Sequence, residues 1–367
     1  MEGMDQFMKL SEKVANNFLH TIVVIDDEAF FGEKISPPGK IVEPGKVGIH
    51  KREEYGAIDL KRTQHSLNAK EVIDNFALYG KVCSVLKPEE EQDYSIYKPI
   101  AMRTDAFIID WEIHNDNGED AIAIIGKIIE SDLTFEPRLR LIIIYTGETD
   151  IDNITPKIKA KLDDYFDSYE TSKDGVTFIK GYLRITVYFK NRLNLKPELH
   201  DRVISGENLA KVVSLEFSNI TSGLVSNFTL ESMSALRDNT HLILGKFGPK
   251  IDPPFLSHRA LLPNPNDVKY HVIDLLINEY HSILEDYNVG KEVEIESVKA
   301  WLDHTNPPNK EILIRSKKVV IDKKCIIEWQ EKSLEKSKWY KNLKPSAQKE
   351  IKNNIHRQLT NCFCKDN

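Results

Sequence analysis

The chain of 367 residues is predicted to fold as a doubly wound α/β domain with a parallel five-stranded sheet, followed by a mostly α-helical domain. Three observations predict this. Over the first 195 or so residues, short apolar runs alternate with segments of helical periodicity, as parallel strands joined by helices require. The run at residues 20–26 is continuous, as in a strand covered on both faces. After Lys190, helical periodicity continues with few interruptions.

Five apolar runs are the predicted strands, and three segments between them have the periodicity of helices. The strands are expected at residues 20–26, 81–87, 105–110, 140–147 and 183–190. The helices are expected at residues 63–79, 117–131 and 154–166. Gly80 is a stop signal for the first helix, and Pro156 is placed in the first turn of the third.

Two polar segments lengthen this α/β pattern. Residues 31–62, rich in Gly, Pro, Lys and Glu, separate the first strand from its helix, and residues 88–104 form a second insertion. The first insertion lies beside the carboxyl end of the first strand, where open α/β sheets place their ligands. The α/β domain is expected to span residues 1–198, and the helical domain residues 199–367.

The second half of the chain is predicted to be helical over residues 207–248, 267–287 and 294–304, with a hairpin at 311–322 and a helix at 325–342. The helix at 267–287 is strongly amphipathic. Its apolar stripe is expected to face the core, and dimerisation is the lesser alternative. The stripe consists of Val268, Val272, Leu275, Leu276 and Ile283.

The composition, 41% hydrophobic and 29% charged, is typical of a soluble globular protein. No apolar run approaches the roughly 20 residues that span a bilayer, and the first residues lack the layout of a signal peptide. A cytoplasmic location without a membrane contact is therefore expected. The four cysteines, at positions 83, 325, 362 and 364, are too few and too scattered for a disulfide framework. The CFC sequence near the end is interpreted as free thiols rather than a soft-metal site.

The net charge of −7 is unevenly distributed. Residues 310–357 contain 14 Lys and Arg against 6 Asp and Glu, so this segment is basic while the rest of the chain is acidic. A solvated helical surface explains the basic segment most simply. Binding of nucleic acid or of an acidic partner by the same segment is the alternative.

Polar and charged residues stand where four of the predicted strands end. Asp26 and Asp27 follow the first strand and Asp110 the third, while Thr146 and Lys190 lie at the ends of the last two. Because the carboxyl ends of parallel strands meet at one edge of a sheet, these side chains are expected in one crevice. Three carboxylates suit Mg²⁺, and an ammonium and a hydroxyl suit a phosphate. A carboxylate nucleophile beside a metal and an ammonium is chemistry that makes an aspartyl phosphate.

The sequence resembles the receiver domain of two-component response regulators over about residues 20–195. The resemblance is carried by VVIDDE, FIIDWE with NGEDAI, IIIYTGE and VYFK, in this order. It implies the receiver fold, which is flavodoxin-like. It also implies that Asp26, Asp27 and the backbone carbonyl of Trp111 hold Mg²⁺ together with Asp110. Asp110 would accept a phosphoryl group from a histidine kinase.

The resemblance further implies that Thr146 is the switch hydroxyl and that Lys190 pairs with the phosphate. Gly147 is a small residue, as is usual after that hydroxyl. Asn191, however, follows Lys190 where receivers commonly have a cis-proline, and the preceding segment 167–182 is long and polar. The distance along the chain from the acidic pair to the acceptor is also longer than usual. These departures suggest a divergent branch of receivers, found beside ATPase-type sensor proteins in bacterial defence and signalling loci.

The function implied is therefore that of a signalling protein which accepts a phosphoryl group on Asp110 and then changes how its helical domain contacts a partner. The partner would be a histidine kinase or an ATPase-type sensor, and a homodimer is an open alternative. A second hypothesis is a Mg²⁺-dependent phosphoesterase that uses the same acids, with Asp110 and Glu112 as metal ligands. A third is a degenerate receiver that acts as a protein-binding module. In simpler interpretations, Trp111 only packs and Thr146 only suits a strand.

Overall fold

The computed structural model describes residues 6–31, 67–90, 92–134, 138–190, 195–314, 317–349 and 351. The chain divides into two compact units, Leu19–Ile220 and a second unit that combines Met1–Phe18 with Thr221–Asn367. These two units do not follow the predicted boundary after residue 198. That boundary, as the end of the α/β domain, stays a prediction. No helix among the described residues combines the length and the apolar character that crossing a membrane requires.

The first unit is built on a seven-stranded sheet with the order β2-β1-β3-β4-β7-β6-β5. Five of its strands are parallel neighbours, which confirms the predicted parallel core. They are β1 (Thr21–Ile25), β2 (Val82–Leu86), β3 (Ala106–Ile109), β4 (Arg140–Thr146) and β7 (Leu183–Phe189). The count of five strands is corrected, since β5 (Glu170–Thr171) and β6 (Thr177–Lys180) extend the sheet as antiparallel strands.

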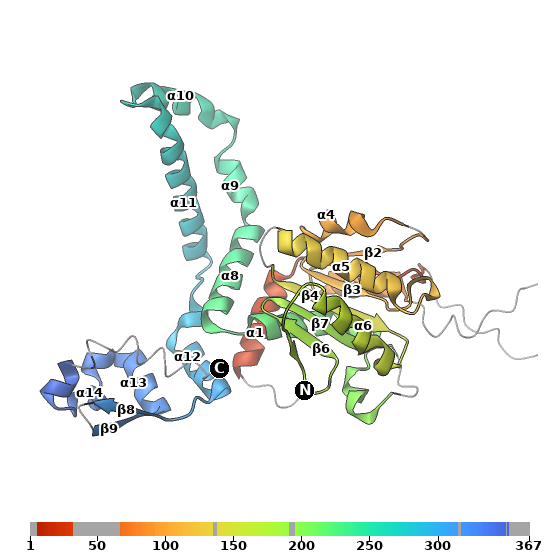
Figure 1. The fold of residues 1–367 in the computed structure, drawn as a ribbon. Helices are drawn as coiled ribbons and strands as arrows, with labels where there is room; N and C mark the ends of the chain where they lie inside the picture. The colour runs from red at the N-terminus through yellow and green to blue at the C-terminus, as the bar shows by residue number, and fades with distance from the viewer. Residues whose placement is uncertain are drawn as a thin grey trace, which may run out of the picture. The chain divides into compact units, whose positions relative to one another are not determined.

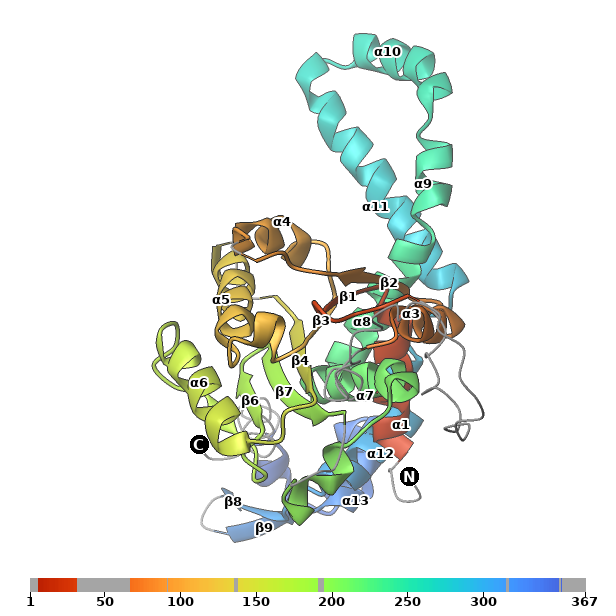
Figure 2. The ribbon, with the colours of Figure 1, turned by 90° about the vertical axis from the view of Figure 1, so that its right-hand side faces the viewer.

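The helices of this unit lie on both faces of the sheet (Figures 1 and 2). One set comprises α4 (Tyr97–Ala101), α5 (Glu119–Thr134) and α6 (Ile151–Asp163), and the other comprises α3 (Ala69–Leu78) and α7 (Leu209–Thr221). Short 3₁₀ turns connect them: η1 (Tyr94–Ile96), η2 (Ile113–Asn115), η3 (Pro197–Arg202) and η4 (Gly206–Asn208).

Two details of the helix prediction are wrong. The segment 88–104 is not merely an inserted loop, because it contains α4, whose Tyr97 and Ala101 are fully buried. Helix α6 begins at Ile151, so Pro156 lies inside the helix and not in its first turn. The insertion at residues 31–62, apart from its first residue, and Asn191 lie outside the described residues.

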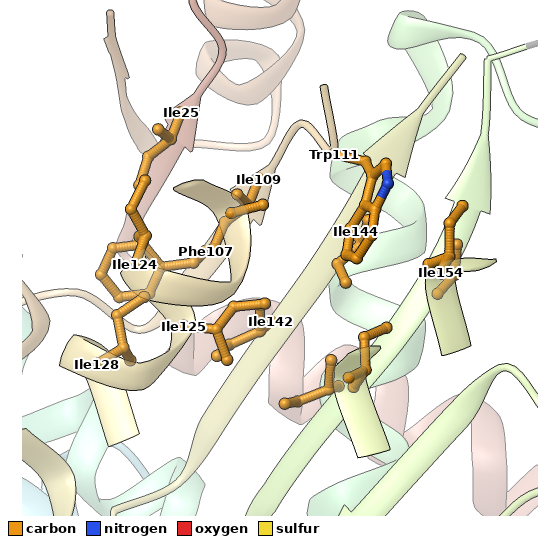
Figure 3. Packing of buried hydrophobic residues seen from close by; sticks show 14 of the residues in the cluster. Ile25, Phe107, Ile109, Trp111, Ile124, Ile125, Ile128, Ile142, Ile144 and Ile154 are labelled. Carbon is orange, nitrogen blue, oxygen red and sulfur yellow. The ribbon is translucent and has the colours of Figure 1, made fainter. Parts of the chain in front are cut away.

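The main core lies between the sheet and helix α5 (Figure 3). Isoleucines of α5 pack against apolar side chains of the three central strands, and the α6 side chain Ile154 extends the same layer. Trp111, which follows β3, is wholly buried in this cluster. The labelled residues are Ile25, Phe107, Ile109, Trp111, Ile124, Ile125, Ile128, Ile142, Ile144 and Ile154. This packing fixes the carboxyl ends of the strands, where the polar side chains gather.

The other face of β7 is polar and joins α7 through a buried network. The Glu216 carboxylate of α7 accepts hydrogen bonds from Arg184 and Tyr188 of β7, both at 2.6 Å, and from Arg202 of η3 at 3.0 Å. Arg202 also donates to Asp174, which lies in the turn between β5 and β6. One carboxylate therefore connects a strand of the sheet, a helix and a 3₁₀ turn.

The second unit is mostly helical, as predicted. It contains α1 (Gln6–Phe18), α8 (Leu224–Asp238), α9 (Thr240–Lys246), α10 (Asp252–Leu261), α11 (Val268–Asp286), α12 (Ile295–Thr305), α13 (Lys323–Lys332) and α14 (Lys338–Lys341). Its 3₁₀ turns are η5 (Pro249–Ile251), η6 (Pro265–Asp267), η7 (Lys291–Val293) and η8 (Leu334–Lys336), and the predicted hairpin is β8 (Lys310–Ile314) with β9 (Lys317–Ile321). Helices α9 and α11 run side by side, with α10 joining their ends (Figures 1 and 2).

The prediction that the stripe on α11 faces the core is wrong for the middle of the helix. Val268 and Ile283 are buried, but Leu275 between them is 52% exposed. The aromatic residues of the basic segment do form a small core, in which the rings of Trp329 and Trp339 lie 4.9 Å apart. Of the cysteines, Cys83 and Cys325 are free thiols, while positions 362 and 364 lie outside the described residues.

Candidate functional site

Strand register brings the predicted site residues to one edge of the sheet. Ile25 of β1 lies opposite Ile109 of β3, so Asp26 and Asp110, which follow them, are neighbours. Strand β4 ends at Thr146, and β7 ends one residue before Lys190. The backbone N–H of Lys190 donates to the carbonyl of Thr146 at 2.7 Å, which fixes the two strand ends together.

Three carboxylates form the centre of this edge. Oxygens of Asp26, Asp27 and Asp110 lie within 4.8 Å of one another. Asp26 is 1% exposed and Asp110 is 5% exposed, while Asp27 is partly buried. Carboxylates that are this close together and this well buried repel one another unless a cation compensates their charge. The predicted acidic cluster is therefore present, and its charge has to be balanced.

Lys190 supplies part of that balance. Its ammonium Nζ lies 3.1 Å from Asp26 Oδ2 and 3.0 Å from Asp110 Oδ2, and its side chain is 6% exposed. The same ammonium lies 5.5 Å from the centre of the Tyr145 ring, a cation–π contact. The tyrosine is held in place because its hydroxyl donates to the carbonyl of Ile204 at 3.0 Å.

Burial and charge act in opposite directions on this lysine and its acid. Burial raises the pKa of Asp110, Lys190 lowers it, and Asp26 raises it further, so that the net direction is upward. Burial alone would lower the pKa of Lys190, but the carboxylates of Asp110 and Asp26 outweigh this and raise it. Lys190 is therefore a fixed positive charge among three acids. The net charge of the cluster is still negative when all three carboxylates are ionised.

The remaining carboxylate oxygens show where a further cation would bind. Asp26 Oδ1 accepts the N–H of Glu28, Asp110 Oδ1 accepts that of Trp111, and Asp27 Oδ2 accepts that of His114. Within the described part of the chain, the other oxygen of Asp27, Oδ1, is buried and has no hydrogen-bond partner. An unpartnered buried carboxylate oxygen is costly unless a cation or water meets it. The donor set and this orphaned oxygen fit a hard divalent cation.

Two predicted roles are compatible with the structure but are not tested by it. The Thr146 side chain is fully buried, and its Oγ1 accepts the N–H of Glu148 at 2.9 Å, which leaves the hydroxyl proton for another acceptor. The Trp111 side chain packs in the core, and its backbone carbonyl as a metal ligand stays a prediction.

Sequence reasoning missed the loop that orients Asp27. Within η2 and the turn that follows, His114, Asn115 and Asn117 have φ values of 57°, 55° and 61°, and Gly118 has 84°. His114 Nδ1 lies 2.9 Å from Asp120, and Nε2 lies 3.1 Å from the carbonyl of Pro88. Burial lowers the pKa of His114, but these partners outweigh it and raise the pKa. The HNDNG sequence is the signal, because Asn, Asp and Gly tolerate left-handed backbone.

Gly118→Ala is expected to lower the free energy of unfolding by about 2–3 kcal/mol, since left-handed strain adds to overpacking. A Cβ at this position would lie 2.2 Å from the buried indole of Trp111, and φ is +84°. Gly175→Ala is the matched control, because its φ is +74° but nothing lies within 4 Å of the added Cβ. It should cost about 1 kcal/mol, from backbone strain alone. Urea unfolding measures the free energy of unfolding of both variants. Equal losses would show that an added Cβ at residue 118 does not clash with Trp111.

Comparison with known proteins identifies the α/β part of the chain. Residues 18–195 match the family described as the response receiver domain. No curated protein and no solved structure gives a significant match to the chain. The matched span contains the whole sheet and all the residues of the acidic site.

Proposed function

Residues 18–195 are a response receiver domain, which gives the chain a response-regulator-like role in signalling, and we propose that Asp110 is its phosphoryl acceptor. The observation that carries the proposal is the convergence of three carboxylates and a buried lysine at the strand ends, with Asp27 Oδ1 lacking a partner. Asp26, Asp27, Asp110 and the Trp111 carbonyl would hold Mg²⁺. When bound, this ion supplies Lewis-acid stabilisation of the transferred phosphoryl group.

The chain's own residues divide the transfer between them. A carboxylate oxygen of Asp110 forms the new bond to phosphorus, while the bond from phosphorus to the donor's leaving group breaks, so the leaving group keeps the electron pair. The Lys190 ammonium, already 3.0 Å from Asp110, would compensate the charge of the phosphoryl group. The Thr146 hydroxyl would donate its proton to a phosphoryl oxygen. Lys190 and Thr146 would thus move toward the same new anion.

The output of this switch is part of the proposal. We expect phosphorylation to change how the helical part of the chain contacts a partner. The donor would be a histidine kinase or an ATPase-type sensor protein in a cytoplasmic phosphorelay, of the kind associated with bacterial defence. Nucleic-acid binding by residues 310–357 stays an alternative for the output.

One contact weighs against the phosphoesterase hypothesis, in which Glu112 is a second metal ligand. Glu112 Oε2 accepts the N–H of Asn117 at 3.2 Å, within its own loop. Among the described residues, the group that could hold an ion contains Asp26, Asp27 and Asp110 and not Glu112.

The test is to incubate the full chain with acetyl phosphate and Mg²⁺ and to measure its intact mass. We expect one added phosphoryl group in the wild type, none in Asp110→Asn, and none when EDTA removes the metal. Asp152→Asn is the matched control, since Asp152 is an exposed acid whose side chain is 79% accessible, and it should keep the adduct. Release of phosphate from p-nitrophenyl phosphate without an adduct would instead indicate a phosphoesterase. Neither adduct nor turnover would indicate a binding module.

A further inference from the structure

Helix α11 has a second apolar stripe that its own unit leaves exposed. Tyr270, Ile273, Ile277, Tyr280 and Tyr287 are 57%, 49%, 54%, 37% and 55% exposed. We call these five residues the outer seam. The spacing along the seam, with Leu284 as a sixth member that is partly buried, alternates between three and four residues from Tyr270 to Tyr287, the C-cap residue that follows α11. This is the a/d spacing of a coiled coil, in which a and d face a partner helix.

The outer seam is distinct from the face of α11 that packs against helices α8, α9 and α10. Ile283 and Leu276 belong to a cluster with Ala235 of α8, Ile243 of α9 and Phe247. At the other end of α11, the His271 ring contacts that of His258 in α10, with 5.1 Å between ring centres. These helices therefore already share a core. Leu284 packs against it and the Tyr287 hydroxyl donates to Asn239 Oδ1 at 2.7 Å, so the part of the outer seam outside that core consists of Tyr270, Ile273, Ile277 and Tyr280.

The five residues of the outer seam are from 37% to 57% exposed. Together they expose on the order of 500 Å², since a large side chain offers about 200 Å². This lies within the range of about 300–600 Å² for the largest apolar patch of a typical monomer, which is often a functional surface. It is less than the roughly 800 Å² that each partner buries in a standard interface, so side chains beside the seam would have to add to the contact.

Charges beside the seam favour pairing with an identical helix in parallel. With Tyr270 and Ile277 at a positions, Lys269 is at a g position and Asp274 is at the e position five residues later. In a parallel coiled coil, g of one helix faces this e of its partner. Both side chains are exposed, so Lys269 of each copy would meet Asp274 of the other, twice by symmetry. Within one helix, residues five apart do not face each other.

We propose that the outer seam of α11 is a homodimer interface, in which two copies of this chain pair as a parallel coiled coil. The inference is independent of the phosphoryl chemistry, because it uses only residues of the helical unit. It assigns the second copy a defined site on the chain, and it gives the exposed tyrosines and isoleucines a partner.

The test measures the mass of the full chain by light scattering at micromolar concentration. We expect the wild type to be a dimer and Ile273→Lys with Ile277→Lys to raise its dissociation constant at least about tenfold, because charges would be buried in the seam. Val225→Lys, at a position 72% exposed on α8, is the control and should stay dimeric. Circular dichroism verifies that each variant is folded. A monomeric wild type, or a seam variant that still dimerises, overturns the proposal.

The register has a separate test. Lys269→Glu alone and Asp274→Lys alone should each weaken the dimer, because each places like charges opposite one another. The double swap should restore the wild-type affinity, since the pair is re-formed with its charges exchanged. A dimer that the swap fails to restore overturns the parallel arrangement.

Discussion

Replacing Glu216 with alanine is expected to lower the free energy of unfolding by about 3–5 kcal/mol, the usual loss when one partner of a buried ion pair is removed. Glu216 is 3% exposed and accepts hydrogen bonds from Arg184, Tyr188 and Arg202. Alanine would leave the guanidinium of Arg184 buried without its carboxylate. Arg202 would keep Asp174, so Arg184 carries most of the loss.

Equilibrium urea unfolding of the full chain measures this loss, with Asp152→Ala as the matched control. Asp152 also forms an ion pair in this unit, with Lys196 at 3.0 Å, but the two side chains are 79% and 56% exposed. Such an exposed pair contributes at most about 1 kcal/mol, so its removal should hardly change the midpoint. A Glu216 variant as stable as this control would show that the network adds no net stability.

Strand β7 relates this network to the candidate site. Tyr188, which donates to Glu216, is two residues before Lys190, which contacts Asp26 and Asp110. A movement of Lys190 is therefore only two residues of backbone away from Tyr188 and its hydrogen bond to Glu216 of α7. We expect Glu216 variants to affect the switch as well as the stability.

The sequence was sufficient for the parallel sheet because each central strand is buried on both faces. A strand such as β4, whose seven residues are all buried, has to be a continuous apolar run. The site followed from the same pattern, since the residue after such a run lies at the carboxyl edge of the sheet. Asp26 and Asp110 were found in this way, and the structure places both next to Lys190.

Elements that depend on only a few residues were not predictable in the same way. Strand β5 has two residues and β6 has four, which is too short for an alternation to be recognised. Helix α4 has five residues in a polar segment, and its burial depends on contacts with α5. The HNDNG sequence indicates a turn with left-handed residues, but the N–H of His114 that orients Asp27 is a backbone group, so the sequence does not show which acid it binds. The outer seam was missed because a sequence shows which residues are apolar but not which face is already covered.

Replacing Lys190 with methionine is expected to lower the free energy of unfolding by about 3–5 kcal/mol in the absence of divalent cations. Methionine keeps much of the side-chain volume but removes the ammonium that lies 3.1 Å from Asp26 and 3.0 Å from Asp110. Two buried carboxylates would then face each other without compensation. Removing one of them should relieve this repulsion, so Lys190→Met combined with Asp110→Asn is expected to be more stable than Lys190→Met alone.

Thermal and urea unfolding with and without Mg²⁺ test the lysine and the proposed metal site together. If Asp26, Asp27 and Asp110 hold the ion, added Mg²⁺ should stabilise Lys190→Met more than the wild type, because the variant lacks the competing ammonium. Lys196→Met, which removes the exposed partner of Asp152, is the control and should resemble the wild type under both conditions. Equal stabilisation of Lys190→Met and the wild type by Mg²⁺ would mean that the ammonium and the ion do not share these carboxylates. The phospho-acceptor assignment would then lack its electrostatic basis, since the same carboxylates must bind the metal while Lys190 pairs with the phosphoryl group.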